Sequence, residues 1–395
     1  MKTPHKIVVA CDSFKGSMSS LDVALAAREG IDDILPGCRT EIMAVADGGE
    51  GTVGALITSC NGEKVELAVS DPLMRPVRAC YGIINPADNL TAGKQGNRKT
   101  AVIEVAEASG LPLLTEKERN PWLASSYGTG ELIMDALSRG CTDILVGLGG
   151  SATSDGGTGL LCALGYRFLD TDGNALPGNG ASLSRIISID ASTVPEIVRK
   201  AHFQVACDVD AVFSGTNGAA VIFGPQKGAD QIMVQTLDDG LASFAALILK
   251  ETGIDVNAIP GSGAAGGLGG AFKAFLNAEL MPGIEMVLET IDFDTRIADA
   301  DLVITGEGRM DSQTVKGKTP FGILQHATRQ GVPVIAICGK CSARELLVNA
   351  GFRSIDEISP AGLTLEQMME PSTAKANVRN TVRRLCREIF CQRGK

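Results

Sequence analysis

The stretch DILVGLGGSATSDGGTGLLCALG, residues 143–165, places a short apolar run, a glycine-rich turn and a helical pattern in direct succession. The apolar run at 144–148, bounded by glycine, is typical of a fully buried strand. Glycines in the turn allow close approach of the backbone, and helix-start amides together with the helix dipole attract anions. The turn therefore predicts an anion-binding site in which Asp155 holds a metal or accepts a proton. The alternative is that Asp155 only caps the helix.

The same pattern occurs a second time, near the start of the chain. Asp47-Gly-Gly-x-Gly-x-x-x-Ala-Leu matches the ten residues that begin at Asp155. This second copy follows a predicted strand at 41–45, and Glu50, three residues after Asp47, has the spacing of a capping box. Both segments are therefore predicted to begin helices directly after strands, with an acidic side chain at the helix start.

Predicted strands and helices alternate through the chain. Buried strands are expected at 7–10, 100–110, 203–206, 301–305 and 332–337, a strand pair at 64–69 and 77–84, and helices at 20–29, 232–250 and 378–389. Ser19 is the expected cap of the first helix and Gly30 its expected end. This alternation predicts an α/β fold with largely parallel sheets, whose ligands bind beyond the carboxyl ends of the strands. The polar segment 85–99 is the expected crossing between two domains.

Composition excludes several classes of protein. The 395 residues are enough for two domains, and a net charge of −10 argues against a nucleic-acid partner. We expect no membrane span, since no run of about 18 apolar residues is present. The first residues lack an apolar signal region, so a cytoplasmic protein with 11 reduced cysteines is expected.

The loops after the predicted strands combine acids with cations and glycine turns. The acids are Asp12, Asp47, Glu50, Asp155, Asp208, Asp210, Glu307 and Asp311, and the cations are Lys15, Lys227, Arg309 and Lys318. Phosphoryl transfer uses this mixture, because cations and amides bind phosphates while carboxylates hold magnesium and orient the nucleophile. A P-loop is absent, since Ser312 stands where its first glycine would be.

Other chemistries have weaker support. GSGAAG at 261–266 fits a dinucleotide fingerprint, but no buried strand precedes it. His5, His202 and His326 are isolated, and we interpret them as surface or filler residues. Cys338 and Cys341 resemble half of a zinc or redox site without a second pair.

As a set, the loops resemble the motifs of the bacterial glycerate kinase family. The motifs occur in the family's order from residue 7 to about residue 340: CDSFKGSMSS, VADGGEGTV, SSYGTGELI, GLGGSATSDGGTG, FGPQKGA, GSGAAGGLG and ITGEGRMDSQTVKGK. Cys11 replaces the family's usual proline, and Gly16 stands where glutamate is common. The resemblance implies two α/β domains with the active site in the cleft. A discontinuous flavodoxin- or Rossmann-like domain covers 1–84 and 284–395, and the inserted α/β domain covers 85–283.

The resemblance also implies an activity: transfer of the γ-phosphoryl of ATP, with Mg²⁺, to a hydroxyl of D-glycerate, typically giving 2-phosphoglycerate. The expected catalytic residues are Asp208 or Asp47 as base, with Lys15 and Arg309. Asp155 and Asp311 are the expected metal ligands. Substrate and phosphate contacts are expected from Asp12, Ser13, Gly48, Gly49, Glu50, Gly149, Gly150, Ser151, Thr153, Lys227, Gly306, Glu307, Gln313 and Lys318.

Two other functions stay open at this level, a nicotinamide dehydrogenase and a sensor that binds glycerate without consuming ATP. The sequence also leaves open which glycerate hydroxyl is phosphorylated and whether the chain forms a homo-oligomer. D-glycerate and ATP are the expected small-molecule partners.

Overall fold

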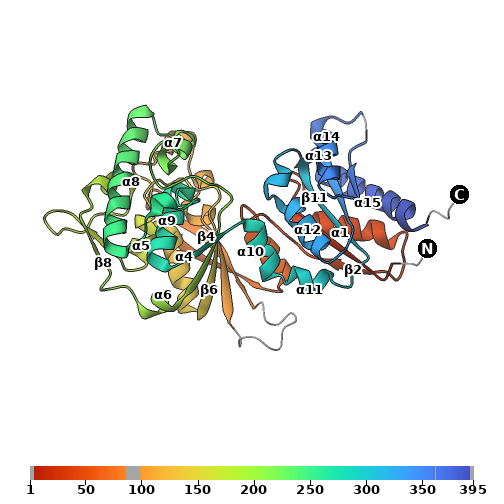
Figure 1. The fold of residues 1–395 in the computed structure, drawn as a ribbon, viewed down its shortest axis with the longest axis horizontal. Coiled ribbons are helices and arrows are strands. Elements are labelled where there is room, and N and C mark those ends of the chain that lie inside the picture. Colours follow the sequence, from red (N-terminus) through yellow and green to blue (C-terminus); the bar gives the residue numbers. More distant parts are fainter. Residues whose placement is uncertain (1–3, 86–97, 361, 392–395) are drawn as a thin grey trace. The chain divides into compact units, whose positions relative to one another are not determined.

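The computed structural model describes residues 4–85, 98–360 and 362–391, and the chain divides into two compact units (Figure 1). Unit 1 comprises Met1–Asp47, Gly54–Asn61 and Val287–Lys395, and unit 2 comprises Gly48–Val53 and Gly62–Met286. Each unit is built around its own sheet. The expected α/β architecture of two parts is confirmed, and both units are discontinuous in sequence.

Unit 1 contains a five-stranded, fully parallel sheet in the order β13-β12-β11-β1-β2. Its strands are β1 (Lys6–Cys11), β2 (Arg39–Ile42), β11 (Leu302–Met310), β12 (Val334–Cys341) and β13 (Ser354–Glu357). Its helices are α1 (Ser20–Asp32), α11 (Phe293–Ile297), α12 (Thr319–Arg329), α13 (Arg344–Asn349), α14 (Leu365–Met369) and α15 (Pro371–Cys386). Helices α2 (Thr52–Ser59) and α10 (Gly283–Thr290) each extend across a boundary between the two units.

Helices α1 and α15 share the core on one face of this sheet. Ser19 caps α1 as expected, because its side chain accepts a hydrogen bond from the N–H of Asp22. The expected end at Gly30 is wrong, since α1 continues to Asp32. Gly30 instead allows close packing, because a Cβ there would lie 2.5 Å from the carbonyl oxygen of Arg379 on α15. This contact joins the two ends of the chain.

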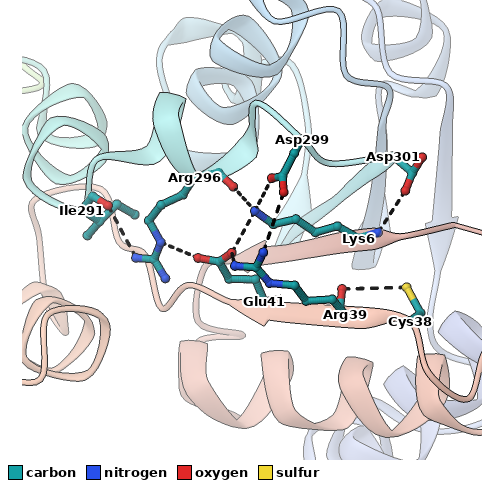
Figure 2. Close-up of polar contacts among 8 residues, drawn as sticks. All are labelled: Lys6, Cys38, Arg39, Glu41, Ile291, Arg296, Asp299 and Asp301. Atoms are coloured by element: carbon teal, nitrogen blue, oxygen red, sulfur yellow. Dashed lines mark hydrogen bonds and ion pairs between the residues drawn. The ribbon is translucent and has the colours of Figure 1, made fainter. Parts of the chain in front are cut away.

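A partly buried polar cluster joins β1 and β2 to residues 296–301, just before β11, at the amino edge of the sheet (Figure 2). The ammonium of Lys6 on β1, 2% exposed, donates to Asp299 Oδ1 at 2.6 Å and to the carbonyl of Arg296 at 2.5 Å. It also lies 3.0 Å from Glu41 Oε2 on β2, and Glu41 Oε1 accepts from Arg296 Nε at 2.6 Å. Burial alone would raise the pKa of Glu41, but Arg296 and Lys6 outweigh it and lower that pKa. The cluster therefore neutralises its own buried charges.

Unit 2 contains a six-stranded sheet in the order β10-β9-β6-β5-β4-β3, antiparallel between β3, β4 and β5 and parallel elsewhere. Its strands are β3 (Glu63–Ser70), β4 (Pro76–Ile84), β5 (Lys99–Glu104), β6 (Cys141–Gly147), β9 (His202–Ala206) and β10 (Glu279–Met281), with β7 (Arg167–Leu169) and β8 (Ser188–Asp190) as a separate pair. Its helices are α3 (Ala106–Ser109), α4 (Tyr127–Ser138), α5 (Thr158–Ala163), α6 (Glu196–Lys200), α7 (Ala219–Phe223), α8 (Gln231–Thr252) and α9 (Ala264–Leu276).

The boundary between the parts differs from the expected one at 84/85. The hairpin of β3 and β4 belongs to unit 2, because Gly82–Ile84 of β4 pair with Thr100–Val102 of β5. After the short segment Gly48–Val53, the chain enters unit 2 again at Gly62 and stays there until Met286. It returns to unit 1 at Val287, close to the expected return at 283/284. Most of the expected crossing 85–99, residues 86–97, lies outside the described residues.

Within the described ranges, one helix, α8, is long and apolar enough to cross a membrane by length and composition alone. One such helix is weak evidence for a membrane span, because the core helix of a globular domain passes the same test. The apolar face of α8 is buried in the core of unit 2, where Leu237, Leu241, Phe244 and Ile248 are fully covered. Amphipathic packing of this kind is typical of a helix that closes the core of a globular domain.

Candidate functional site

The carboxyl ends of β1 and β11 bring two acidic side chains of unit 1 into one polar group. Asp12 follows β1, and its N–H donates to the carbonyl of Gly306 on β11 at 2.8 Å. Its carboxylate accepts from the N–H of Ser13 at 2.6 Å and from Thr319 Oγ1 at 2.9 Å. Burial and then the charge of Asp47 raise the pKa of Asp12. Asp12, Ser13 and Asp47 therefore lie close together in unit 1.

Glu307 on β11 is the second carboxylate of this group. Its Oε1 accepts from Thr314 Oγ1 at 2.8 Å, and its Oε2 lies 3.6 Å from Lys318 Nζ. Burial raises the pKa of Glu307 and the nearby charge of Asp12 raises it further, while Thr314 and Lys318 oppose both effects. The two carboxyls therefore repel each other at the strand ends, which favours a cation or a proton there.

The two threonines are residues that the sequence analysis missed. Thr319 is the first residue of α12, and Thr314 lies in the short turn before it. The sequence pattern that could have identified Thr319 is the helix start Lys318-Thr319-Pro320, in which a hydroxyl and a proline occupy the first turn.

Arg309, near the end of β11, and the turns at Asp311 and Lys15 are more exposed. Arg309 is 72% exposed, and its Nε lies 3.6 Å from Asp311 Oδ2. Asp311 Oδ1 accepts from the N–H of Gln313 at 2.9 Å, so that carboxylate closes a turn. Lys15 is also exposed, on the turn between Phe14 and Met18. Exposed cations of this kind are available to an anionic ligand.

In unit 2, the two glycine turns lie against the carboxyl ends of β6 and β9. A Cβ on Gly147 would lie 2.3 Å from the carbonyl oxygen of Gly48, and a Cβ on Gly48 would lie 2.5 Å from the Cβ of Ala206. A Cβ on Gly149 would lie 3.4 Å from the Cα of Gly49. Gly147 and Gly48 therefore have no room for a side chain, whereas a Cβ on Gly149 would make an ordinary contact. Gly48 and Gly150 both have positive φ. The structure thus brings the two turns together.

Asp208 lies at the same edge, after β9. It is exposed, and its Oδ1 accepts from the N–H of Gly283 at 3.0 Å. Glu50 is exposed on the Gly48–Val53 turn. Both carboxylates are therefore open to a ligand.

The expectation that Asp155 holds a metal is not supported by its surroundings. Asp155 is fully buried, and its Oδ2 accepts from the N–H and hydroxyl of Ser126 at 2.8 and 2.7 Å and from the N–H of Gly159 at 3.2 Å. Its Oδ1 accepts from the N–H of Gly157 at 3.0 Å. Burial raises the pKa of Asp155, and these donors oppose the rise. The carboxylate is thus used in joining the starts of α4 and α5, and the capping alternative fits it.

The expectation that Lys227 contacts phosphate is not supported either, because its side chain is buried. Lys227 is 2% exposed, and its Nζ donates to Ser151 Oγ at 2.9 Å and to the carbonyl of Thr153 at 2.5 Å. Burial lowers the pKa of Lys227 to about 7, although Asp155 acts in the opposite direction. Ser151 is buried and Thr153 fully so. Lys227 therefore supports the turn after β6 from within, and neither it nor Thr153 presents its side chain to a ligand.

The dinucleotide fingerprint at 261–266 has a packing role. A Cβ on Gly266 would lie 2.0 Å from the carbonyl oxygen of Thr153, and one on Gly263 would lie 2.0 Å from that of Val212. No strand precedes the segment, which follows a short 3₁₀ turn at Val256–Ala258. The glycines therefore permit close backbone packing, and the dehydrogenase interpretation has no structural support here.

The Cys338 and Cys341 pair lies along one extended strand, β12. Residues three apart in a strand are separated by about 10 Å, beyond the Cα distance that a disulfide spans. Burial raises the pKa of the Cys338 thiol well above its usual range. The pair thus lacks the geometry of a redox site. In the described part of the chain, no three His, Cys, Asp or Glu side chains are grouped to hold a metal ion.

Each sheet, taken by itself, has acids or glycine turns at the carboxyl ends of its parallel strands, which is the edge where α/β proteins bind their ligands. The chain belongs to the glycerate kinase family, whose model matches residues 7–390. It is 44% identical to a glycerate kinase of Halalkalibacterium halodurans, over 93% of this chain and 94% of that one. It is 45% identical to glycerate 2-kinase of Escherichia coli K12, over 85% of each.

A solved structure agrees with this assignment. The crystal structure of a protein assigned as glycerate kinase 2 from Salmonella typhimurium LT2 matches with a TM-score of 0.88 at 40% identity, covering 98% of both chains. The resemblance inferred from the motifs is therefore confirmed along nearly the whole chain.

Proposed function

We propose that the protein transfers the γ-phosphoryl of ATP to a hydroxyl of D-glycerate, giving 2-phosphoglycerate. Its 45% identity to a glycerate 2-kinase carries this proposal. The carboxylates and amides at the strand ends support it, since they are the groups that phosphoryl transfer requires.

Asp208 and Asp47 remain the two candidates for the base that orients or deprotonates the glycerate hydroxyl. Asp208 is exposed after the end of β9. Asp47 lies near enough to Asp12, at the end of β1, for its charge to raise the pKa of Asp12. Exposed Lys15 and Arg309 are proposed to bind phosphate or the glycerate carboxylate. The amides of Gly48, Gly49, Gly149 and Gly150 are proposed to contact an anionic group.

Mg²⁺ is proposed to arrive with the phosphates of ATP. Magnesium usually needs only one or two protein carboxylates beside substrate phosphates, so three grouped acids are not required. Asp311 stays a proposed ligand, and the mutually repelling pair of Asp12 and Glu307 also fits a divalent cation. Bound there, the ion would offset the charge of the phosphates.

The test is an assay with MgATP and D-glycerate, coupled through enolase and pyruvate kinase without phosphoglycerate mutase. Enolase accepts 2-phosphoglycerate, so pyruvate formation is the expected result and reports both the activity and the position of transfer. Pyruvate only after mutase is added would mean transfer to the other hydroxyl. No ADP release from folded protein would contradict the proposal.

The two candidate bases are separated by Asp208→Asn and Asp47→Asn. Loss of the true base should lower kcat by about 10²–10⁴-fold and leave KM much less changed. Asp172→Asn is the matched control, since Asp172 is an exposed acid of unit 2 outside the candidate site residues. Equal, small effects of all three substitutions would contradict a base at either position.

The cellular setting follows from the same assignment. We propose a cytoplasmic, soluble enzyme whose partners are D-glycerate and ATP. The net charge of −10 supports the absence of a nucleic-acid partner, because phosphate backbones bind clustered cations.

A further inference from the structure

A buried glutamate, Glu104, holds the Gly48–Val53 turn at the sheet edge of unit 2. Glu104 is the last residue of β5 and is 7% exposed. Its Oε1 accepts from the N–H of Val53 at 2.8 Å, and its Oε2 accepts from the N–H of Gly51 at 3.3 Å. These two amides flank Thr52, the first residue of α2. One carboxylate thus satisfies two backbone donors at the start of that helix.

Glu104 is far in sequence from the amides that it accepts from, which distinguishes this interaction from ordinary helix capping. Helix-start amides are usually capped by a serine, threonine, aspartate or asparagine next to the helix. Here the acceptor comes from a strand 51 residues further along the chain. Glu104 therefore ties the turn to β5, whereas a local cap would stabilise only the helix.

Several contacts confine the turn on its other sides. The Gly48 carbonyl faces Gly147 at the end of β6, and Gly48 itself faces Ala206 at the end of β9. Thr52 Oγ1 donates to the carbonyl of Gly49 at 2.7 Å. With Glu104 on β5, the turn is held against the ends of three neighbouring strands. This leaves Glu50 exposed while the backbone beneath it is fixed.

Burial disfavours the charged form of the Glu104 carboxylate. Burial raises the pKa of Glu104, the two amides oppose that rise, and the acidic neighbours Glu107 and Glu50 add to it. A protein gains little stability from such a group compared with an apolar side chain of similar size. What Glu104 contributes to the turn is the pair of hydrogen bonds from the N–H groups of Gly51 and Val53.

We propose that Glu104 is a positioning residue for phosphoryl transfer. Its carboxylate fixes the Gly48–Val53 turn so that the Gly48 and Gly49 amides and Glu50 keep the geometry needed by the anionic substrates. This inference rests on the proposed glycerate kinase activity. It assigns to Glu104 a role through the turn and no contact with the reacting atoms.

The test is Glu104→Gln, which retains the size of the side chain but can accept only one of the two amide hydrogen bonds. Displacement of the turn should lower kcat by about 10²-fold, with a much smaller change in KM for D-glycerate. Glu107→Gln is the matched control. Glu107 lies three residues further on and accepts from the N–H and Sγ of Cys80, both at 3.1 Å. Its kcat should stay close to that of the unsubstituted enzyme.

The outcomes separate this inference from the function itself. An inactive unsubstituted enzyme contradicts the glycerate kinase proposal. An active enzyme whose Glu104→Gln variant loses stability but keeps kcat contradicts the positioning role alone. If Glu104→Gln does not fold, Glu104→Asp retains the charge and is too short to reach both amides. Its kcat should then fall while its fold, measured by circular dichroism, is retained, and an unchanged kcat would again contradict the positioning role.

Discussion

Replacement of Lys227 by methionine should change how the stability of unit 2 depends on pH. Methionine fills a similar volume and removes the ammonium that donates to Ser151 and Thr153. Burial lowers the pKa of Lys227 to about 7 in the folded protein, whereas in the unfolded chain it has its ordinary value of 10.5. Between these two pH values the unfolded chain binds one more proton than the folded one, so the unsubstituted protein gains stability as pH rises.

The magnitude follows from the two pKa values. Integrated from pH 7 to pH 9, the gain in the free energy of unfolding at this one group is about 2 kcal/mol. The Lys227→Met variant lacks this pH-dependent contribution to the free energy of unfolding. All other titratable groups are present in both proteins, so their contributions cancel in the comparison. The stability of the unsubstituted protein relative to the variant should therefore increase by about 2 kcal/mol between pH 7 and pH 9.

Urea unfolding followed by tryptophan fluorescence is a suitable assay. The single tryptophan, Trp122, lies in unit 2 and packs against the core of that unit. Lys200→Met is the matched control, since Lys200 is exposed on α6, and its stability should stay within about 0.5 kcal/mol of the unsubstituted protein. A difference between Lys227→Met and the unsubstituted protein that is constant from pH 7 to pH 9 would refute the reasoning.

Three further predictions concern the polar groups of the fold. Lys6→Met should lower the free energy of unfolding by about 2 kcal/mol, because Glu41 keeps only its arginine partners and the carbonyl of Arg296 loses its donor. Arg39→Ala, at the exposed side of the same cluster, should cost less than about 1 kcal/mol, and urea unfolding followed by circular dichroism measures both. Asp155→Asn should cost about 2–3 kcal/mol, because the amide leaves buried donors unpaired, and a fall in kcat at unchanged stability would instead support a metal-binding role. Mild oxidation should produce no disulfide between Cys338 and Cys341 in the folded protein, and peptide mapping that found one would contradict the extended geometry of β12.

Much of the fold follows from local patterns. Short apolar runs bounded by glycine and turn residues predict β1, β6 and β9, because the pattern depends on residues next to one another in the chain. The polar residues after these runs also follow from sequence, since carboxyl ends of parallel strands share one edge. In this way the sequence predicts Asp12 and Asp208 directly after β1 and β9, where the structure has them. Glu307 is predicted after a strand that ends at 305, but β11 continues to Met310 and Glu307 lies within it.

The surroundings of each polar side chain depend on contacts distant in sequence. Lys227 meets Ser151 across 76 positions, and Asp155 meets Ser126 across 29, so neither burial is visible in the local pattern. The assignment of β3 and β4 to unit 2 depends in the same way on their pairing with β5.

The sequence by itself therefore determined the family, most of the strands, and the acidic and glycine-rich turns that follow them. Only the tertiary structure decided which of those groups are exposed and which support the turns from within. It also showed Glu104, because a residue that acts through two amides 51 and 53 positions away has no local signature. The physical reason is that periodicity records which face of an element is buried, whereas hydrogen-bond partners are set by packing between elements.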